Sequence, residues 1–244
     1  MSLNKTYKLW KSIIKMAKIN FIGIGVQKAG TSWLAKCLNE HPDIYIHPEK
    51  EAHFFNKGKF YLNNYHYESS FNHDNQKIIG EITPSYISNP KVAKKIFQYN
   101  PKVKMIIILR DPTERCISQY KMEMSRGTIE SNNGLWDAFI RDLPKYGPMK
   151  QRGLYKEQIE RYYKYFPVKQ MLILDYNEIG NNPQLFIKKS FDFLEVENTF
   201  IPKCLKRNIK HKKDIRKKIT ILEEDIEKVK TYYRNYDSLL TTES

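Results

Sequence analysis

The segment 25–33 has the composition of an anion-binding loop. It reads Gly-Val-Gln-Lys-Ala-Gly-Thr-Ser-Trp and follows the apolar run 21–24. Its two glycines have the spacing of a P-loop, but Thr31 stands where the P-loop lysine belongs, and Lys28 lies inside the loop. Backbone N–H groups at the start of a helix attract an anion, and the hydroxyls of Thr31 and Ser32 add two donors. From these residues alone, an anion site and a well-capped connection between a strand and a helix are about equally supported.

Apolar runs that alternate with helical patterns predict the elements that position this loop. They predict a parallel central sheet covered on both faces, which is a three-layer α/β sandwich. Ligands of such folds bind at the carboxyl ends of the strands. We expect a single domain over 19–244, preceded by a basic extension over 1–18. A short packed or frayed helix is favoured for this extension, and contact with a membrane surface is the alternative. The predicted strands are 19–26, 44–46, 78–81, 103–109 and 170–174, and the predicted helices are 31–38, 91–99, 112–124, 135–143, 154–165, 183–194 and 214–240.

The composition favours a folded protein that attracts anions. The chain has 244 residues, 41% of them apolar, and a formal net charge of +15, which attracts nucleic acids, nucleotides, acidic polysaccharides and lipid head groups alike. No apolar run approaches the ~18–20 residues of a membrane span, and the N-terminus lacks the order of a signal peptide. The three cysteines lie at wide spacing, without the pattern of a zinc site or a disulfide framework. We therefore expect a cytoplasmic location.

Two motifs in the chain share their spacing with a known family. The segment 28–34 reads Lys-Ala-Gly-Thr-Ser-Trp-Leu, and Arg110, at the end of the most apolar predicted strand, is followed by Ser118 eight residues later. These motifs resemble those of the sulfotransferases that use 3′-phosphoadenosine 5′-phosphosulfate (PAPS). The first is similar to their first loop, Lys-x-Gly-Thr-[Ser/Thr]-x-Leu, and the second is similar to their arginine and serine that bind the 3′-phosphate. The resemblance implies the P-loop-like fold of these enzymes. It also implies a donor site made of Lys28, Ala29, Gly30, Thr31, Ser32, Trp33, Arg110 and Ser118, in which core packing of Trp33 is as well supported as contact with the purine.

Two further segments resemble the heparan-sulfate-type branch of that family, the N- and 3-O-sulfotransferases. The segment 48–55, Pro-Glu-Lys-Glu-Ala-His-Phe-Phe, is similar to their Lys-Glu-x-His-Phe-Phe, and the segment 80–86, Gly-Glu-Ile-Thr-Pro-Ser-Tyr, is similar to their Glu-Lys-[Ser/Thr]-Pro-x-Tyr. Looser similarity continues to about residue 194. Ile82 stands in place of the lysine that faces the acidic acceptor, and the late cysteine pair is reduced to Cys204. These two departures leave the acceptor open.

The resemblance places the general base at Glu51, with Lys28 and His53 as further catalytic residues. The predicted strand 44–46 delivers Glu51 and His53 to the same rim of the sheet as the Lys28 loop. Glu51 would remove the proton of the acceptor, and Lys28 would stabilise charge on the bridging oxygen of the leaving group. The alternative is that Glu51 pairs with a lysine and that His53 or Glu81 takes the proton.

The sequence therefore predicts transfer of a sulfuryl group from PAPS to a hydroxyl or amine of an acceptor. A carbohydrate or glycolipid is the favoured acceptor, and a small metabolite and a protein tyrosine stay open as alternatives. The product nucleotide is adenosine 3′,5′-bisphosphate (PAP), and no metal is required. The alternatives are a non-catalytic protein that binds PAP or PAPS and a P-loop-type nucleotide kinase that needs Mg²⁺. The sequence does not determine an oligomeric state.

The basic run 203–218 has two interpretations. It is a solvated charge run, or it is a late loop that closes over the nucleotide through Arg207, Lys210 and His211, as in related enzymes. No motif with interleaved aromatic residues accompanies it, so nucleic acid is not an expected partner.

Overall fold

A computed structural model describes residues 18–57, 64–130, 133–141, 148–206 and 219–242. The described residues form two compact units. Unit 1 comprises those up to 109 and those from 159 to 206, and unit 2 comprises those from 110 to 158 and those from 219 onward. Helix α7 (Tyr155–Tyr163) continues from one unit into the other. The single domain over 19–244 stays a prediction.

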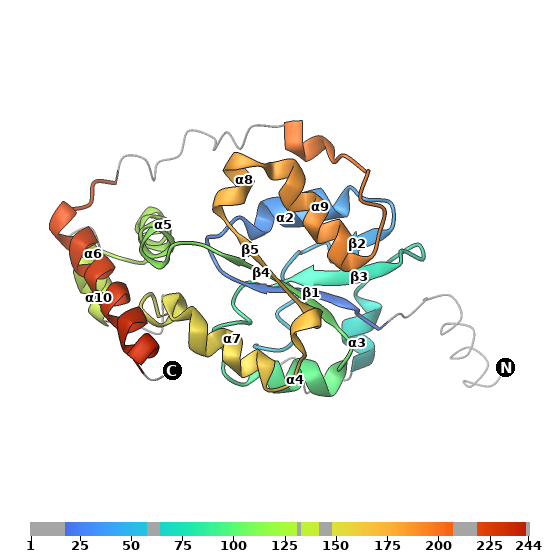
Figure 1. The fold of residues 1–244 in the computed structure, drawn as a ribbon, viewed down its shortest axis with the longest axis horizontal. Coiled ribbons are helices and arrows are strands. Elements are labelled where there is room, and N and C mark those ends of the chain that lie inside the picture. The colour runs from blue at the N-terminus through green and yellow to red at the C-terminus, as the bar shows by residue number, and fades with distance from the viewer. Residues whose placement is uncertain (1–17, 58–63, 131–132, 142–147, 207–218, 243–244) are drawn as a thin grey trace. The chain divides into compact units, whose positions relative to one another are not determined.

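Unit 1 is built around a sheet of five parallel strands in the order β2-β3-β1-β4-β5 (Figure 1). Every residue of β1 and β3 is buried, which is typical of parallel strands covered on both faces. Because β1 lies between β3 and β4, the loop after β1 leaves the sheet at the carboxyl end of a central strand. The strands are β1 (Phe21–Gly25), β2 (Ile44–Ile46), β3 (Ile78–Ile82), β4 (Lys104–Leu109) and β5 (Met171–Asp175).

Helices cover both faces of this sheet. Figure 1 shows α2, α8 and α9 on one face and α3 and α4 on the other. This arrangement confirms the predicted three-layer α/β sandwich with a parallel central sheet. The helices of unit 1 are α2 (Thr31–Asn39), α3 (Asn64–Ser69), α4 (Val92–Tyr99), α8 (Asn177–Asn181) and α9 (Pro183–Leu194), with the 3₁₀ turns η4 (Val168–Gln170) and η5 (Lys203–Lys206).

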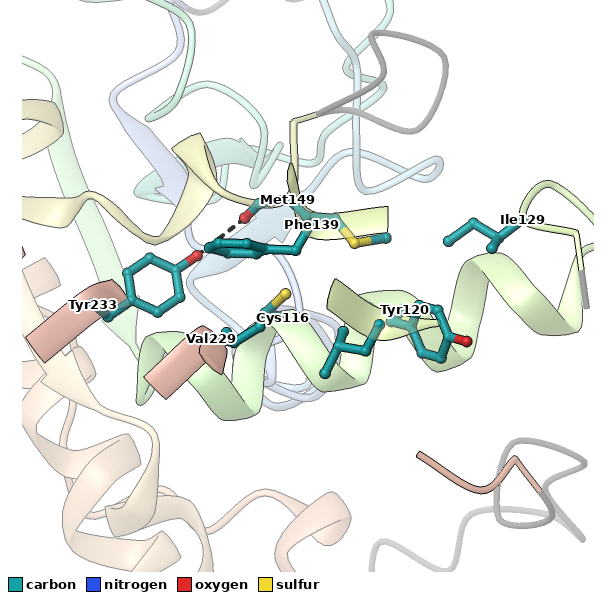
Figure 2. Close-up of a cluster of buried hydrophobic side chains, with 8 residues drawn as sticks. Cys116, Tyr120, Ile129, Phe139, Met149, Val229 and Tyr233 are labelled. Carbon is teal, nitrogen blue, oxygen red and sulfur yellow. Dashed lines mark hydrogen bonds between the residues drawn. The ribbon is translucent and has the colours of Figure 1, made fainter. Parts of the chain in front are cut away.

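Unit 2 consists of α5 (Pro112–Ser125), α6 (Leu135–Arg141), η3 (Gln151–Gly153) and α10 (Glu223–Thr242). Its hydrophobic cluster is shown in Figure 2, where the Tyr233 hydroxyl donates to the Met149 carbonyl at 3.2 Å. Arg115 is fully buried beside it and donates to the Met149 carbonyl at 2.5 Å. These contacts hold α5, the helix that carries Ser118. The cluster contains Cys116, Tyr120, Ile129, Leu135, Phe139, Met149, Val229 and Tyr233.

A disulfide joins Cys37, on α2, to Cys204, in η5. The expectation of no disulfide is therefore wrong. The two cysteines are 167 positions apart in the sequence, and the packing of η5 against α2 brings their Cα atoms to 5.8 Å. Because disulfides persist in oxidising compartments, the cysteine argument for a cytoplasmic location no longer holds. Within the described ranges, no helix has the length and the apolar character that crossing a membrane requires.

Candidate functional site

The loop between β1 and α2 presents the first turn of α2 at the carboxyl end of a central strand. The Val26 N–H donates to the Ile108 carbonyl at 3.0 Å, which keeps the start of the loop on the sheet. Gly30 is the N-cap residue, with a φ of 80°, and the Leu34 N–H donates to its carbonyl at 3.0 Å. A Cβ atom at Gly30 would lie 2.6 Å from Ile179 Cδ1. The left-handed backbone favours glycine at this position, and a side chain there would also displace the end of the Ile179 side chain.

The first turn of α2 has the features of an anion site. Its N-cap residue is Gly30, which has no side chain to accept from the N–H groups of the first turn. Thr31 is buried and Ser32 is exposed at the first two helical positions. Lys28 has a left-handed φ of 73° in the loop that leads to them. The N–H groups of a first turn carry the positive end of the helix dipole, which attracts negative charge.

The two other residues of this motif in the predicted donor site pack into unit 1. Ala29 is fully buried, and Trp33 is half-buried. The Trp33 ring meets the Phe186 ring of α9 edge-on, with 5.6 Å between the centroids. Trp33 therefore has a packing role, which is one of its two predicted roles.

Three ionisable side chains that follow β2 form a chain of contacts that reaches the first turn of α2. Lys50 Nζ lies 2.8 Å from Glu51 Oε1 and donates to Thr31 Oγ1 at 3.3 Å. His53 Nε2 lies 3.4 Å from Glu51 Oε2. The Glu51 side chain is 35% exposed, so one edge of it reaches solvent. The structure thus brings Lys50, Glu51 and His53 together and links them to Thr31.

Glu81, the alternative base from β3, is fully buried. Its Oε1 accepts hydrogen bonds from Tyr67 Oη at 2.6 Å and Tyr86 Oη at 2.8 Å. Its Oε2 accepts from Thr83 Oγ1 at 2.5 Å and from the Ala52 N–H at 2.9 Å. Burial raises the pKa of the Glu81 carboxyl, and these hydrogen bonds oppose that shift. A carboxylate without exposed surface cannot reach an acceptor, so this placement argues against Glu81 as the base.

Unit 2 carries the second part of the predicted donor site. Arg110 Nη2 pairs with Glu114 Oε2 at 3.1 Å, and the Arg110 carbonyl accepts from Tyr155 Oη at 2.8 Å. Burial raises the pKa of Tyr155 to about 12. Asp111 caps α5 by accepting from the Glu114 N–H at 2.8 Å, and Ser118 is half-buried on the same helix. The Arg110 side chain is held in place although it is partly exposed.

Some predictions are not tested by the described residues. Arg207, Lys210 and His211 lie outside them. In the described part of the chain, no group of three or more His, Cys, Asp or Glu residues could hold a metal ion. Independence from metal stays a prediction.

Sequence reasoning missed two roles. The structure shows the pairing of Glu51 with a lysine that the sequence leaves as an alternative, and that lysine is Lys50. The missed role of Lys50 is its second contact, which links Thr31 to Glu51. Glu81 was considered only as a base, whereas it accepts four hydrogen bonds in the interior. A charged residue inside the apolar run 78–82 was the available signal, because such a residue is buried only with partners.

Residues 19–235 match the family model described as a sulfotransferase domain. The membrane-associated sulfotransferase kil1 of Dictyostelium discoideum is 27% identical, over 78% of this chain and 59% of that protein. The heparan sulfate glucosamine 3-O-sulfotransferase 5 of Mus musculus is 29% identical, over 66% of this chain and 48% of that protein. This chain thus spans about half the length of the curated relatives it matches. The crystal structure of a sulfotransferase from Alicyclobacillus acidocaldarius is 25% identical, with a TM-score of 0.76 and coverage of 90% and 92% of the two chains. The chain belongs to the sulfotransferase family.

Proposed function

We propose that this protein transfers a sulfuryl group from PAPS to a hydroxyl or amine of an acceptor and releases PAP. The observation that carries the proposal is the contact of Lys50 with both Thr31 and Glu51. It links the start of α2, whose N–H groups suit a phosphate, to a partly exposed carboxylate that can accept a proton. Family membership supports the same reaction.

We assign the donor to residues of the loop between β1 and α2 and to Arg110 and Ser118, on the basis of the motif resemblance. The loop contributes backbone N–H groups, two hydroxyls and the Lys28 charge, and we assign it the 5′-phosphosulfate. We assign the 3′-phosphate to Arg110 and Ser118, in line with the motif resemblance. The full proposed donor set is Lys28, Ala29, Gly30, Thr31, Ser32, Trp33, Arg110 and Ser118, with Arg207, Lys210 and His211 as late contacts.

In the proposed reaction, Glu51 accepts the proton of the acceptor hydroxyl or amine. The lone pair of that oxygen or nitrogen forms the new bond to sulfur, and the bond from sulfur to the bridging oxygen breaks. The electron pair stays on the 5′-phosphate of PAP, where Lys28 stabilises the growing negative charge. His53, 3.4 Å from Glu51 Oε2, orients the carboxylate. The charge is balanced by side chains and loop N–H groups, so no metal is needed.

For the acceptor, we propose a carbohydrate or glycolipid. The matched 3-O-sulfotransferases act, by their name, on glucosamine of heparan sulfate, which supports a sugar. Ile82 is fully buried, and its N–H donates to the Lys50 carbonyl at 2.9 Å. Because this position lacks the lysine of the heparan-type enzymes, we expect less preference for a highly acidic acceptor.

Radiolabelled PAPS, incubated with a panel of neutral and acidic oligosaccharides and glycolipids in the presence of EDTA, tests the proposal. We expect label in an acceptor and stoichiometric PAP. Tight PAP binding without transfer to any acceptor would support a non-catalytic binding protein. Phosphoryl transfer from ATP that requires Mg²⁺ would support a nucleotide kinase instead.

A further inference from the structure

The Glu81 carboxylate contacts the backbone of the segment 50–55, which carries Glu51 and His53. We infer that Glu81 is a positioning residue that holds this segment in the shape required for proton transfer. The inference rests on the proposed function, because it assigns Glu51 as the group being positioned. Glu81 itself is fully buried, so it has no exposed surface through which to contact an acceptor.

Three N–H groups of the segment face Glu81 or hydroxyls that donate to Glu81. The Ala52 N–H donates directly to Glu81 Oε2 at 2.9 Å. The His53 N–H lies 3.5 Å from Thr83 Oγ1, and the Phe55 N–H lies 3.4 Å from Tyr86 Oη. Because both hydroxyls direct their protons to Glu81, their lone pairs are available to the segment. One carboxylate therefore orders the hydrogen-bond partners of three of the four residues 52–55.

The segment needs such support because its backbone is strained. Lys50 has a φ of 62° and His53 a φ of 54°, and both are residues with a Cβ in the left-handed region. Conformations of this kind cost on the order of 1–3 kcal/mol and persist only when surrounding contacts hold them. The two strained residues flank Glu51 and Ala52. A loss of the Glu81 contact would thus release the backbone on both sides of the proposed base.

A carboxylate suits this position better than an amide does. Glu81 accepts two hydrogen bonds on each oxygen, whereas a glutamine would replace one acceptor oxygen by a group with two N–H donors. That group would face either the two tyrosine hydroxyls or the Ala52 N–H and Thr83. Burying an acid is unfavourable, and burial does raise the pKa of Glu81. The four hydrogen bonds offset this cost, and the gain is a single geometry for the segment.

Glu81→Gln tests the inference with steady-state kinetics and calorimetry. We expect kcat to fall by about 10–100-fold, as for a base that is slightly displaced, while the Kd for PAP changes less than about twofold. The matched control is Tyr99→Phe, which removes another buried hydroxyl from the same aromatic cluster; this hydroxyl accepts the Ile19 N–H at 2.9 Å and donates to Glu68. The control should lower stability and leave kcat unchanged. Equal kcat losses in both variants would mean that Glu81 is only structural.

A double variant separates positioning from independent catalysis. If Glu81 acts through Glu51, then Glu81→Gln combined with Glu51→Gln is no slower than Glu51→Gln alone. If the double variant instead loses kcat by the product of the two single losses, the inference is overturned. If Glu81→Gln does not fold, Thr83→Val removes the hydroxyl shared by Glu81 and His53 at nearly constant volume, and the same non-additive result is expected.

Hydrogen exchange at the Ala52 amide tests the inference without any activity. We expect faster exchange in Glu81→Gln than in wild type, and unchanged exchange would overturn the positioning role. If wild type transfers no sulfuryl group, the proposed function fails, whereas the exchange result still decides whether Glu81 holds the segment.

Discussion

Lys50 forms an ion pair with Glu51, with 2.8 Å between Nζ and Oε1. The same ammonium group donates to Thr31 Oγ1 at the first position of α2, so one cation is shared between the helix start and the proposed base. An anion bound at α2 would compete with Glu51 for this cation. Donor binding would then loosen the pairing of the carboxylate that must accept a proton.

Replacement of Glu51 by Gln should lower kcat by roughly 10²–10⁴-fold, because the amide keeps the shape of the side chain but accepts no proton. Calorimetry should show nearly unchanged PAP binding. Glu49→Gln, at an exposed position two residues earlier, is the matched control and should behave as wild type. Near-normal turnover in Glu51→Gln, together with a large loss in His53→Ala, would transfer the role of base to His53.

Removal of the Lys28 charge should affect turnover more than binding of the product nucleotide. Negative charge grows on the bridging oxygen as the bond from sulfur breaks, so the lysine interacts more strongly with the transition state than with the ground state. We expect Lys28→Met to lower kcat far more than it weakens PAP binding, with Lys28→Arg less affected. Lys36→Met, on the exposed side of α2, serves as control. Equal losses of kcat and PAP affinity would make Lys28 a binding residue only.

Arg110→Ala should weaken PAP binding by about 2–4 kcal/mol, since it removes a charge-assisted contact to the 3′-phosphate. The measurement is calorimetry with EDTA present. Arg126→Ala is the control, because this arginine side chain is 61% exposed and its ion pair with Glu123 is long, at 3.9 Å. Unchanged affinity in Arg110→Ala, or an absolute need for Mg²⁺, would reject the proposed 3′-phosphate site.

Loss of the disulfide should destabilise unit 1. Cys37→Ser and Cys204→Ser should each lower the free energy of unfolding by roughly 2–5 kcal/mol, because the link closes a long stretch of chain in the unfolded state. Urea unfolding with and without reductant measures this. Reductant should destabilise wild type by a similar amount and leave both variants unaffected. Insensitivity of wild type to reductant would show that the bond adds no stability.

Stability should fall at alkaline pH. Burial raises the pKa of Tyr67 and Tyr86 well above 10, and that of Tyr155 to about 12. Above pH ~10 the unfolded chain releases these protons while the folded protein keeps them, so the folded state binds more protons and stability declines as pH rises. The Tyr155 contribution is fully present below pH ~10 and is lost by about 12. Tyr155→Phe should make stability decline less steeply over this pH range. Tyrosinate absorbance of the folded protein measures the titration directly. Titration of Tyr155 at pH ~10 in the folded protein would contradict the prediction.

Local patterns in the sequence were sufficient for the layers of the fold. The strands of unit 1 are short apolar runs, and the larger helices have clear periodicity, so both could be predicted from neighbouring residues alone. Helix α3 was missed because it has six residues and Tyr67 as its single buried side chain, which leaves no periodic pattern. The motif at 28–34 identified the loop and the first turn of α2 because all of its residues are contiguous.

Only the tertiary structure decided which distant residues meet. Lys50 contacts Thr31 across 19 positions, Glu81 contacts Ala52 across 29, and Cys37 bonds with Cys204 across 167. No spacing rule encodes such contacts, because they depend on how the parallel strands are ordered and on how loops pack at their ends. The sequence by itself thus determined the chemical types available at the carboxyl ends of the strands. The folded chain decided that Glu51 is partly exposed and that Glu81 is buried, because only the packing around each carboxylate controls its access to water.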